Sequence, residues 1–128
     1  MKFFVVLLIA LAVTSINVSG QKQKKSEPCA EAQTQADMNI CWGNQYKAAD
    51  ATLNQVYRQL MGKLDDEEKN QLKAVESAWL KYRDANCEFV GDQYKGGTMR
   101  PMIEAICLAD VTKNRTTELR NQIKDRDQ

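Results

Sequence analysis

Four cysteines are the residues of this chain best suited to chemistry, and their spacing limits what that chemistry is. Cys29 and Cys41 lie close together in the sequence, Cys87 and Cys107 lie somewhat further apart, and a long stretch separates the two groups. No Cys-x-x-Cys pair occurs, and the chain contains no histidine. Zinc sites usually combine closely paired cysteines with further cysteine or histidine ligands, and thioredoxin-type centres need a Cys-x-x-Cys pair. The spacing therefore argues against a metal site or a cofactor and favours two structural disulfides.

Residues 1–20 indicate a compartment in which disulfides persist. Lys2 precedes an apolar run from Phe3 to Val13, and small and polar residues follow as far as Gly20. A bilayer span needs roughly 20 apolar residues, whereas a shorter run of this kind suits the central region of a secretory signal peptide. We expect residues 1–20 to be removed and the product to be exported, soluble, to the periplasm or the medium, where an even number of cysteines pairs.

The net charge of the chain limits the classes of partner that it is expected to bind. Residues 1–20 hold one lysine and no acidic residue, so the remaining chain, residues 21–128, carries equal numbers of basic and acidic side chains. Three of the lysines lie in a polar leader, residues 21–28, and residues 26–128 therefore have a net charge of −3. A nucleic-acid-binding domain would need a basic face. The composition therefore predicts no nucleic-acid partner and is compatible with a cationic protein partner.

Apolar residues recur every three or four positions in three stretches, which is the pattern of amphipathic helices. The first stripe is Met38, Trp42, Tyr46, Ala49, Leu53, Val56, Leu60 and Leu64. The second is Leu72, Val75, Trp79, Tyr82, Asn86 and Phe89. The third is Met99, Met102, Ile106, Ala109, Thr116, Leu119 and Ile123. Core packing is the expected role of the aromatic members Trp42, Trp79, Tyr82 and Phe89.

Local signals mark where these helices begin. Thr34 with Asp37 three residues later suggests a capping box. Asp65 or Asp66 can cap the second helix, and Pro101 is tolerated in the first turn of the third. Alternating apolar patterns are missing from the sequence, so the predicted class is all-α: a small, disulfide-linked antiparallel bundle of about three helices. Its connections should lie near residues 62–66 and 91–98.

Such a bundle places Cys41, Cys87 and Cys107 toward one end. We prefer the pairs Cys29–Cys41 and Cys87–Cys107 because each closes a short local loop. The same geometry also lets Cys41 reach Cys87 or Cys107, so the sequence leaves the connectivity open.

Several spaced segments together resemble a known family. They are CAEAQTQADMNIC, YKAADATLNQVYRQL, AWLKYRDANC, GGT and CLADVTKNRTTEL, which fall between Cys29 and Leu119. They are similar to the lysozyme inhibitor LprI-type domain of bacterial exported proteins, which we place at residues 29–124. The resemblance implies a non-enzymatic, protein-binding domain that inhibits a lysozyme. The best-known member resembles a lipoprotein, whereas the lipid-attachment cysteine of that member has no counterpart here.

Inhibition would require a rigid projection that enters the enzyme's cleft, where two carboxyl groups flank the scissile bond. The stretch between Cys87 and Cys107 is the candidate projection. Its partner-binding candidates are Asp92, Tyr94, Lys95, Gly96, Gly97, Thr98 and Arg100. Lys95 or Arg100 could meet an enzyme carboxylate, although Gly96 and Gly97 also suit an ordinary turn between helices.

Arg83 is predicted to lie close to the apolar side of the second helix. A charge in that position needs a counter-charge, and we expect Asp50 or Asp110 to provide it as a structural ion pair.

Two other classes of function compete with a protein-binding domain: an enzyme and a carrier of a small apolar ligand. An enzyme is disfavoured because no histidine base and no glycine-rich phosphate loop is present. A carrier of a small apolar ligand is the alternative, with Met38, Met61, Met99 and Met102 as adaptable wall residues. An internal cavity would favour the carrier, and a full core with a protruding 91–100 loop would favour the protein-binding domain.

Overall fold

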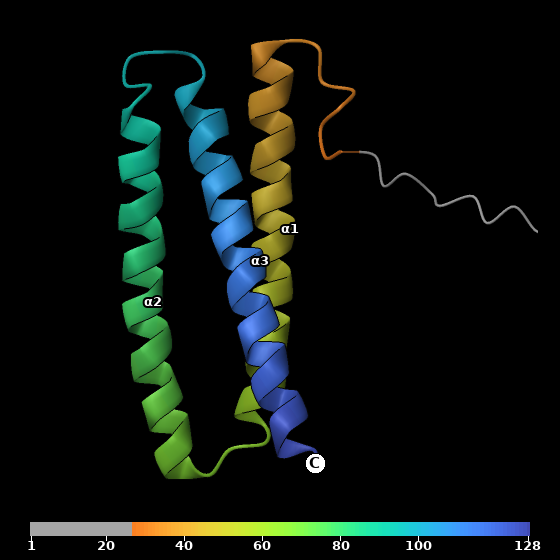
Figure 1. Cartoon of the computed structure of the whole chain (residues 1–128), viewed down its shortest axis with the longest axis vertical. Helices are drawn as coiled ribbons and strands as arrows, with labels where there is room; N and C mark the ends of the chain where they lie inside the picture. Colours follow the sequence, from red (N-terminus) through yellow and green to blue (C-terminus); the bar gives the residue numbers. More distant parts are fainter. Residues whose placement is uncertain (1–26) are drawn as a thin grey trace, which may run out of the picture.

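The computed structural model describes residues 27–128. The expected signal peptide and most of the expected leader fall within residues 1–26 and lie outside the described residues. Three helices follow in the order α1 (Gln35–Met61), α2 (Asp66–Asp92) and α3 (Arg100–Arg126). Successive helices run in opposite directions, so α1 and α3 are parallel, as Figure 1 shows. Within residues 27–128 no strand is present. The prediction of an all-α bundle of three helices is confirmed.

The helix starts follow from the capping residues. Thr34 caps α1 by accepting a hydrogen bond from the backbone N–H of Asp37 at 3.1 Å. Asp65 caps α2 in a complete capping box: its carboxylate accepts from the Glu68 N–H at 2.8 Å, and the Glu68 carboxylate accepts from the Asp65 N–H at 3.2 Å. The third helix has no side-chain cap and begins with Pro101 in its first turn, where a missing N–H costs nothing.

The capping box of α2 is directly testable. Replacing Asp65 by alanine leaves an N–H group of the first turn without its acceptor, so we expect a loss of about 1 kcal/mol in the free energy of unfolding. Asp65→Asn is the matched control, because asparagine keeps the oxygen acceptor and should lose much less. Urea unfolding followed by circular dichroism measures both. Equal losses in the two variants would contradict a role for the side-chain acceptor.

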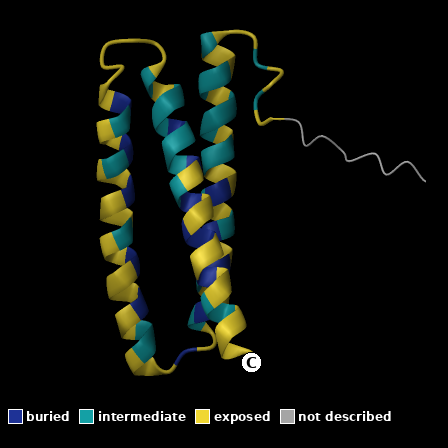
Figure 2. Ribbon diagram, viewed as in Figure 1, coloured by how far each residue is buried: buried dark blue, intermediate teal, exposed yellow. Residues whose placement is uncertain are grey.

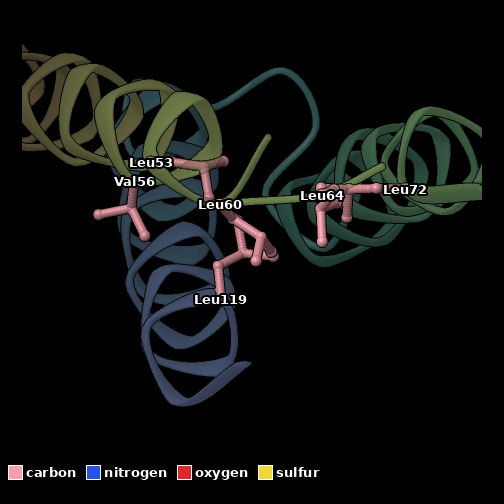
Figure 3. Close-up of a cluster of buried hydrophobic side chains, with 6 residues drawn as sticks. All are labelled: Leu53, Val56, Leu60, Leu64, Leu72 and Leu119. Atoms are coloured by element: carbon pink, nitrogen blue, oxygen red, sulfur yellow. The ribbon is translucent and has the colours of Figure 1, made fainter. Parts of the chain in front are cut away.

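The apolar core is concentrated toward the end of the bundle that holds the α1–α2 connection. Its buried members are Leu53, Val56, Leu60, Leu64, Leu72 and Leu119 (Figure 3). Tyr57, Met61, Trp79 and Ile123 are partly buried and pack against this cluster. Each fully buried leucine contributes about 1.5–3 kcal/mol relative to an exposed one. Leu60 and Leu119 are fully enclosed, which fixes the register of α1 against α3.

Helix α3 is the central element. It packs extensively along α1 and less extensively against α2, whereas α1 and α2 have little direct contact. Figure 1 shows α2 standing apart, while α1 and α3 lie close together. Side chains must therefore bridge from α2 to the other two helices.

The inward face of α2 differs from the predicted one. Its buried residues are Leu72, Glu76, Arg83, Cys87 and Gly91. Val75, Tyr82 and Phe89 are exposed instead, and Figure 2 shows exposed residues along the whole length of α2. The expectation that Tyr82 and Phe89 pack in the core was therefore wrong, because two charged residues occupy the inward positions beside them. Trp42 and Trp79 are half-buried.

Candidate functional site

Both disulfides lie at the end of the bundle where α1 and α3 begin and α2 ends. The structure has the preferred pairing, with Cα–Cα distances of 5.8 Å for Cys29–Cys41 and 5.5 Å for Cys87–Cys107. Cys87 is fully buried, so its bond joins α2 to α3 inside the bundle. The bond from Cys29 instead fixes the segment that precedes α1 to the first turns of that helix.

The loop that connects α2 to α3 extends beyond the second disulfide. Residues 93–99 are all exposed, and short backbone hydrogen bonds fold them into successive turns. The N–H groups of Tyr94, Lys95 and Gly97 donate to the carbonyls of Gly91, Asp92 and Tyr94, respectively. Gly96 has φ +83°, a left-handed conformation that glycine adopts without strain. The loop is therefore a compact turn at the tip of the molecule.

Two polar contacts fix this loop to its surroundings. The Arg100 guanidinium donates to the Asp92 carboxylate at 2.9 Å, which joins the end of α2 to the start of α3. The Asn39 side-chain amide on α1 donates to the carbonyl of Thr98 at 3.1 Å. The loop is thus held from both of its ends and from the neighbouring helix. Its backbone is ordered before any partner arrives, which reduces the entropy cost of binding.

The expected partner-binding residues divide into two groups. Asp92 and Arg100 neutralise each other and Thr98 contacts α1, so these three support the loop. Tyr94 and Lys95 are exposed at the turn, and in the part of the chain that the structure describes Lys95 forms no salt bridge. The tip therefore presents one aromatic ring and one cation to solvent.

A hollow lies beside the other disulfide, against the first turns of α1. Its volume is about 890 Å³, and its lining includes the carboxylates Glu27, Glu31 and Asp37 and the apolar side chain Ile40. It opens at the surface between residues 27–32 and α1, so it is not a cavity within the bundle. Met61 packs on the core and Met99 is exposed. None of the four methionines expected to line a carrier's cavity borders this hollow.

Arg83 of α2 lies among aromatic and acidic groups from two helices. Its guanidinium is 3.0 Å from the Asp50 carboxylate on α1 and 2.8 Å from Asp84. Its central carbon lies 5.4 Å from the centre of the Tyr46 ring and 5.3 Å from that of the Trp79 ring. Such stacking adds cation–π attraction to the ion pair. The structure therefore places the first of the two expected partners, Asp50, beside Arg83.

Asp110, the other expected partner, lies elsewhere. Its carboxylate is 4.0 Å from the Lys113 ammonium group on the same helix. This pair is exposed and contributes little to stability.

Arg115 forms a second bridge, which was not predicted from the sequence. Its guanidinium donates twice to the buried carboxylate of Glu76 on α2, at 2.9 and 3.1 Å, and to Glu118 at 2.8 Å. It also faces the Trp79 ring, whose centre is 5.9 Å away. One signal was available: Glu76 follows Leu72 by four residues and Arg115 precedes Leu119 by four. Both therefore share a face with a core leucine.

The two arginines remain charged in the folded chain. Burial acts to lower the pKa of Arg83 and of Arg115, but hydrogen bonds to Asp84 and Asp50, and to Glu118 and Glu76, outweigh it and raise both values. For the Tyr46 phenol the direction is opposite: burial raises its pKa, whereas the positive charge of the nearby Arg83 lowers it. These groups hold α2 to its neighbours through ion pairs. Their arrangement is structural, and the tip is left as the candidate binding surface.

Among residues 27–128, no group of three or more histidine, cysteine, aspartate or glutamate side chains is placed to hold a metal ion. None of the three helices combines the length and the apolar character that a membrane span requires.

Comparison with known proteins identifies the family of this chain. Residues 26–119 match the family model described as lysozyme inhibitor LprI. An uncharacterized protein of Rhizobium meliloti (strain 1021) is 37% identical over 111 residues, which cover 77% of this chain and 80% of the relative. No solved structure matches the chain. The chain therefore belongs to the lysozyme inhibitor LprI family.

Proposed function

We propose that this chain is an exported, non-enzymatic protein that inhibits a lysozyme by inserting the tip of its α2–α3 loop into the active-site cleft. The observation that carries the proposal is the ordered, exposed turn at Tyr94–Gly96, which is supported by the Cys87–Cys107 disulfide and by the hydrogen bond from Asn39 to Thr98. Family membership supports a lysozyme as the partner. The two disulfides support export, because such bonds persist in oxidising compartments.

The chemistry of the tip suits a cleft lined by carboxyl groups. A glycoside hydrolase holds two of them beside the scissile bond. The Lys95 ammonium can pair with one of these carboxylates, and the Tyr94 ring can pack against the cleft wall, as aromatic anchors do in other interfaces. Arg100 cannot take this part while it pairs with Asp92 at 2.9 Å. Its role is to keep the loop in shape, so we assign the direct contact to Lys95.

The test is a titration of the oxidised 21–128 chain against c-type and g-type lysozymes, following cell-wall hydrolysis and the dissociation constant of the complex. Lys95→Ala and Tyr94→Ala should each weaken inhibition by at least about 30-fold, the effect of losing a central contact of about 2 kcal/mol. Lys124→Ala is the matched control, because Lys124 is an exposed lysine near the opposite end of α3. It should inhibit like the wild-type chain.

Two results would reject parts of the proposal. Inhibition that survives both loop substitutions would move the binding surface away from the tip. Failure to inhibit or to bind either enzyme at about 100 μM, well above the dissociation constants of standard interfaces, would reject lysozyme as the partner.

A further inference from the structure

Helix α2 carries an exposed apolar stripe that the bundle does not use. Val75, Tyr82 and Phe89 are 51%, 59% and 74% exposed, and they follow one another at intervals of seven residues. Ala78 and Ala85 lie between them and are also exposed. These five residues, which we call the α2 stripe, occupy the a and d positions of consecutive heptads. That spacing is typical of a helix that packs against another helix.

The α2 stripe is separate from the candidate tip and from the core. The inward face of α2 is set by Leu72, Glu76, Arg83 and Cys87. At about 100° per residue, the centre of the stripe lies about 130° around the helix from the centre of that face, which is more than a third of a turn. From Val75 to Phe89 it extends over about 21 Å of helix. A continuous apolar strip of this kind on a polar helix marks an interaction surface more often than chance exposure does.

We propose that the α2 stripe binds the same stripe of a second copy of this chain, with the two α2 helices antiparallel. The sizes of the side chains along the stripe support a second copy of the chain as the binding partner. In an antiparallel pair the a positions of one helix face the d positions of the other, so Tyr82 would lie opposite Ala85 of the partner subunit. Phe89 would lie opposite Ala78 of the partner subunit. Each large ring then meets a small side chain, which allows close helix packing. Val75 lies at the margin of the paired region, because the same register sets it opposite Asp92 of the partner subunit.

The charges beside the stripe support the same arrangement. Lys81 and Glu88 flank it, both are exposed, and neither has a salt-bridge partner within residues 27–128. They are about 10.5 Å apart along α2, so they do not pair with each other. The antiparallel register brings Lys81 beside Glu88 of the partner subunit, and the two-fold axis repeats the pair. A parallel pairing would instead set Lys81 beside Asn86 of the partner subunit, without a counter-charge.

The test is sedimentation equilibrium of the oxidised 21–128 chain without lysozyme, from about 1 μM to about 1 mM. We expect a reversible monomer–dimer equilibrium, because a strip of this length is smaller than a standard interface and should give a weak complex. The double variant Tyr82→Ser, Phe89→Ser should remain monomeric throughout. Ile40→Ser is the matched control, since Ile40 is 65% exposed but lies on α1 beside the hollow. It should dimerise like the wild-type chain.

Charge reversal tests the direction of the helices. Lys81→Glu alone and Glu88→Lys alone should each raise the dissociation constant about 5-fold or more, because each places like charges together twice. The double variant Lys81→Glu, Glu88→Lys should recover the wild-type constant. A monomer at every concentration, or a dimer that keeps its affinity without Tyr82 and Phe89, would overturn the proposal. A double variant that stays weak would overturn the antiparallel register. Binding of lysozyme is not involved, so these outcomes are independent of the proposed function.

Discussion

Unfolding of the Arg115→Met variant is expected to need about 3–5 kcal/mol less free energy than unfolding of the wild-type chain. In the native structure Glu76 is buried, and its carboxylate accepts two hydrogen bonds from Arg115 at 2.9 and 3.1 Å. Methionine fills a similar volume but donates no hydrogen bond. The substitution therefore leaves a buried carboxylate without a counter-charge between α2 and α3. Chemical denaturation at neutral pH, followed by helix content, measures the loss.

A double variant separates the cost of the unpaired charge from the loss of packing. In Glu76→Leu, Arg115→Met the whole pair is replaced by apolar side chains of similar size, an exchange that is often neutral or stabilising. We expect this variant to be closer in stability to the wild-type chain than Arg115→Met is. The exposed pair of Asp110 and Lys113 is the control, because Lys113→Met should change stability by less than about 1 kcal/mol. A small effect of Arg115→Met would show that water reaches Glu76.

Removal of the Cys87–Cys107 disulfide has the second large expected effect. Replacing both cysteines by alanine should lower the free energy of unfolding by about 3 kcal/mol, because the bond closes a loop of sequence separation 20 and restricts the unfolded chain. Cys87 is fully buried, so packing is lost as well. Thermal unfolding of the variant and of the wild-type chain, both without reductant, gives the difference.

The other disulfide is the matched control. Replacing Cys29 and Cys41 by alanine should cost less, although the loop is of similar size, with a sequence separation of 12. The reason is that residues 27–33 precede α1 and can regain freedom in the folded state without opening the bundle, which offsets the entropy gained on unfolding. Equal losses for the two disulfides would show that the segment before α1 is an integral part of the cooperative unit.

The helix boundaries could be predicted from the sequence because they depend on local chemistry. Thr34, Asp65 and Pro101 act on the first turn of the helix that they start, and all three lie where the sequence predicted. The disulfide pairing was a preference based on the short loops that the two bonds close, and the structure decided it against pairing of Cys41 with Cys87 or Cys107. Signals that act within a few residues need no knowledge of the tertiary structure.

The inward face of α2 could be predicted only in part, through Leu72 and the pairing of Arg83 with Asp50, because two stripes compete on this helix. Val75, Tyr82 and Phe89 form one with helical spacing, and the periodicity of the sequence identifies it as the core face. The structure buries Glu76 and Arg83 instead. Their burial depends on counter-charges from α3 and α1, which lie 39 and 33 residues away in sequence. Periodicity alone does not reveal which of two faces meets a neighbouring helix.

The residue types at the candidate tip could be predicted from the sequence, but the roles of the individual residues could not. Lys95 and Arg100 are equivalent as cations in the sequence. The turn brings Arg100 to Asp92, eight residues earlier, and leaves Lys95 in solvent. This distinction depends on the path of the loop between the two helices, so it follows only from the three-dimensional structure.

The central position of α3 has a consequence for how the chain acquires its fold. The most extensive partner of α1 is α3, which is synthesised after α2, and residues 62–99 separate the two. A chain that emerges from its N-terminus therefore exposes the apolar side of α1 until α3 has also been released. Such intermediates are prone to aggregation. Folding of α1 must then wait for α3, and any fragment that ends before Arg100 lacks the surface on which α1 is assembled.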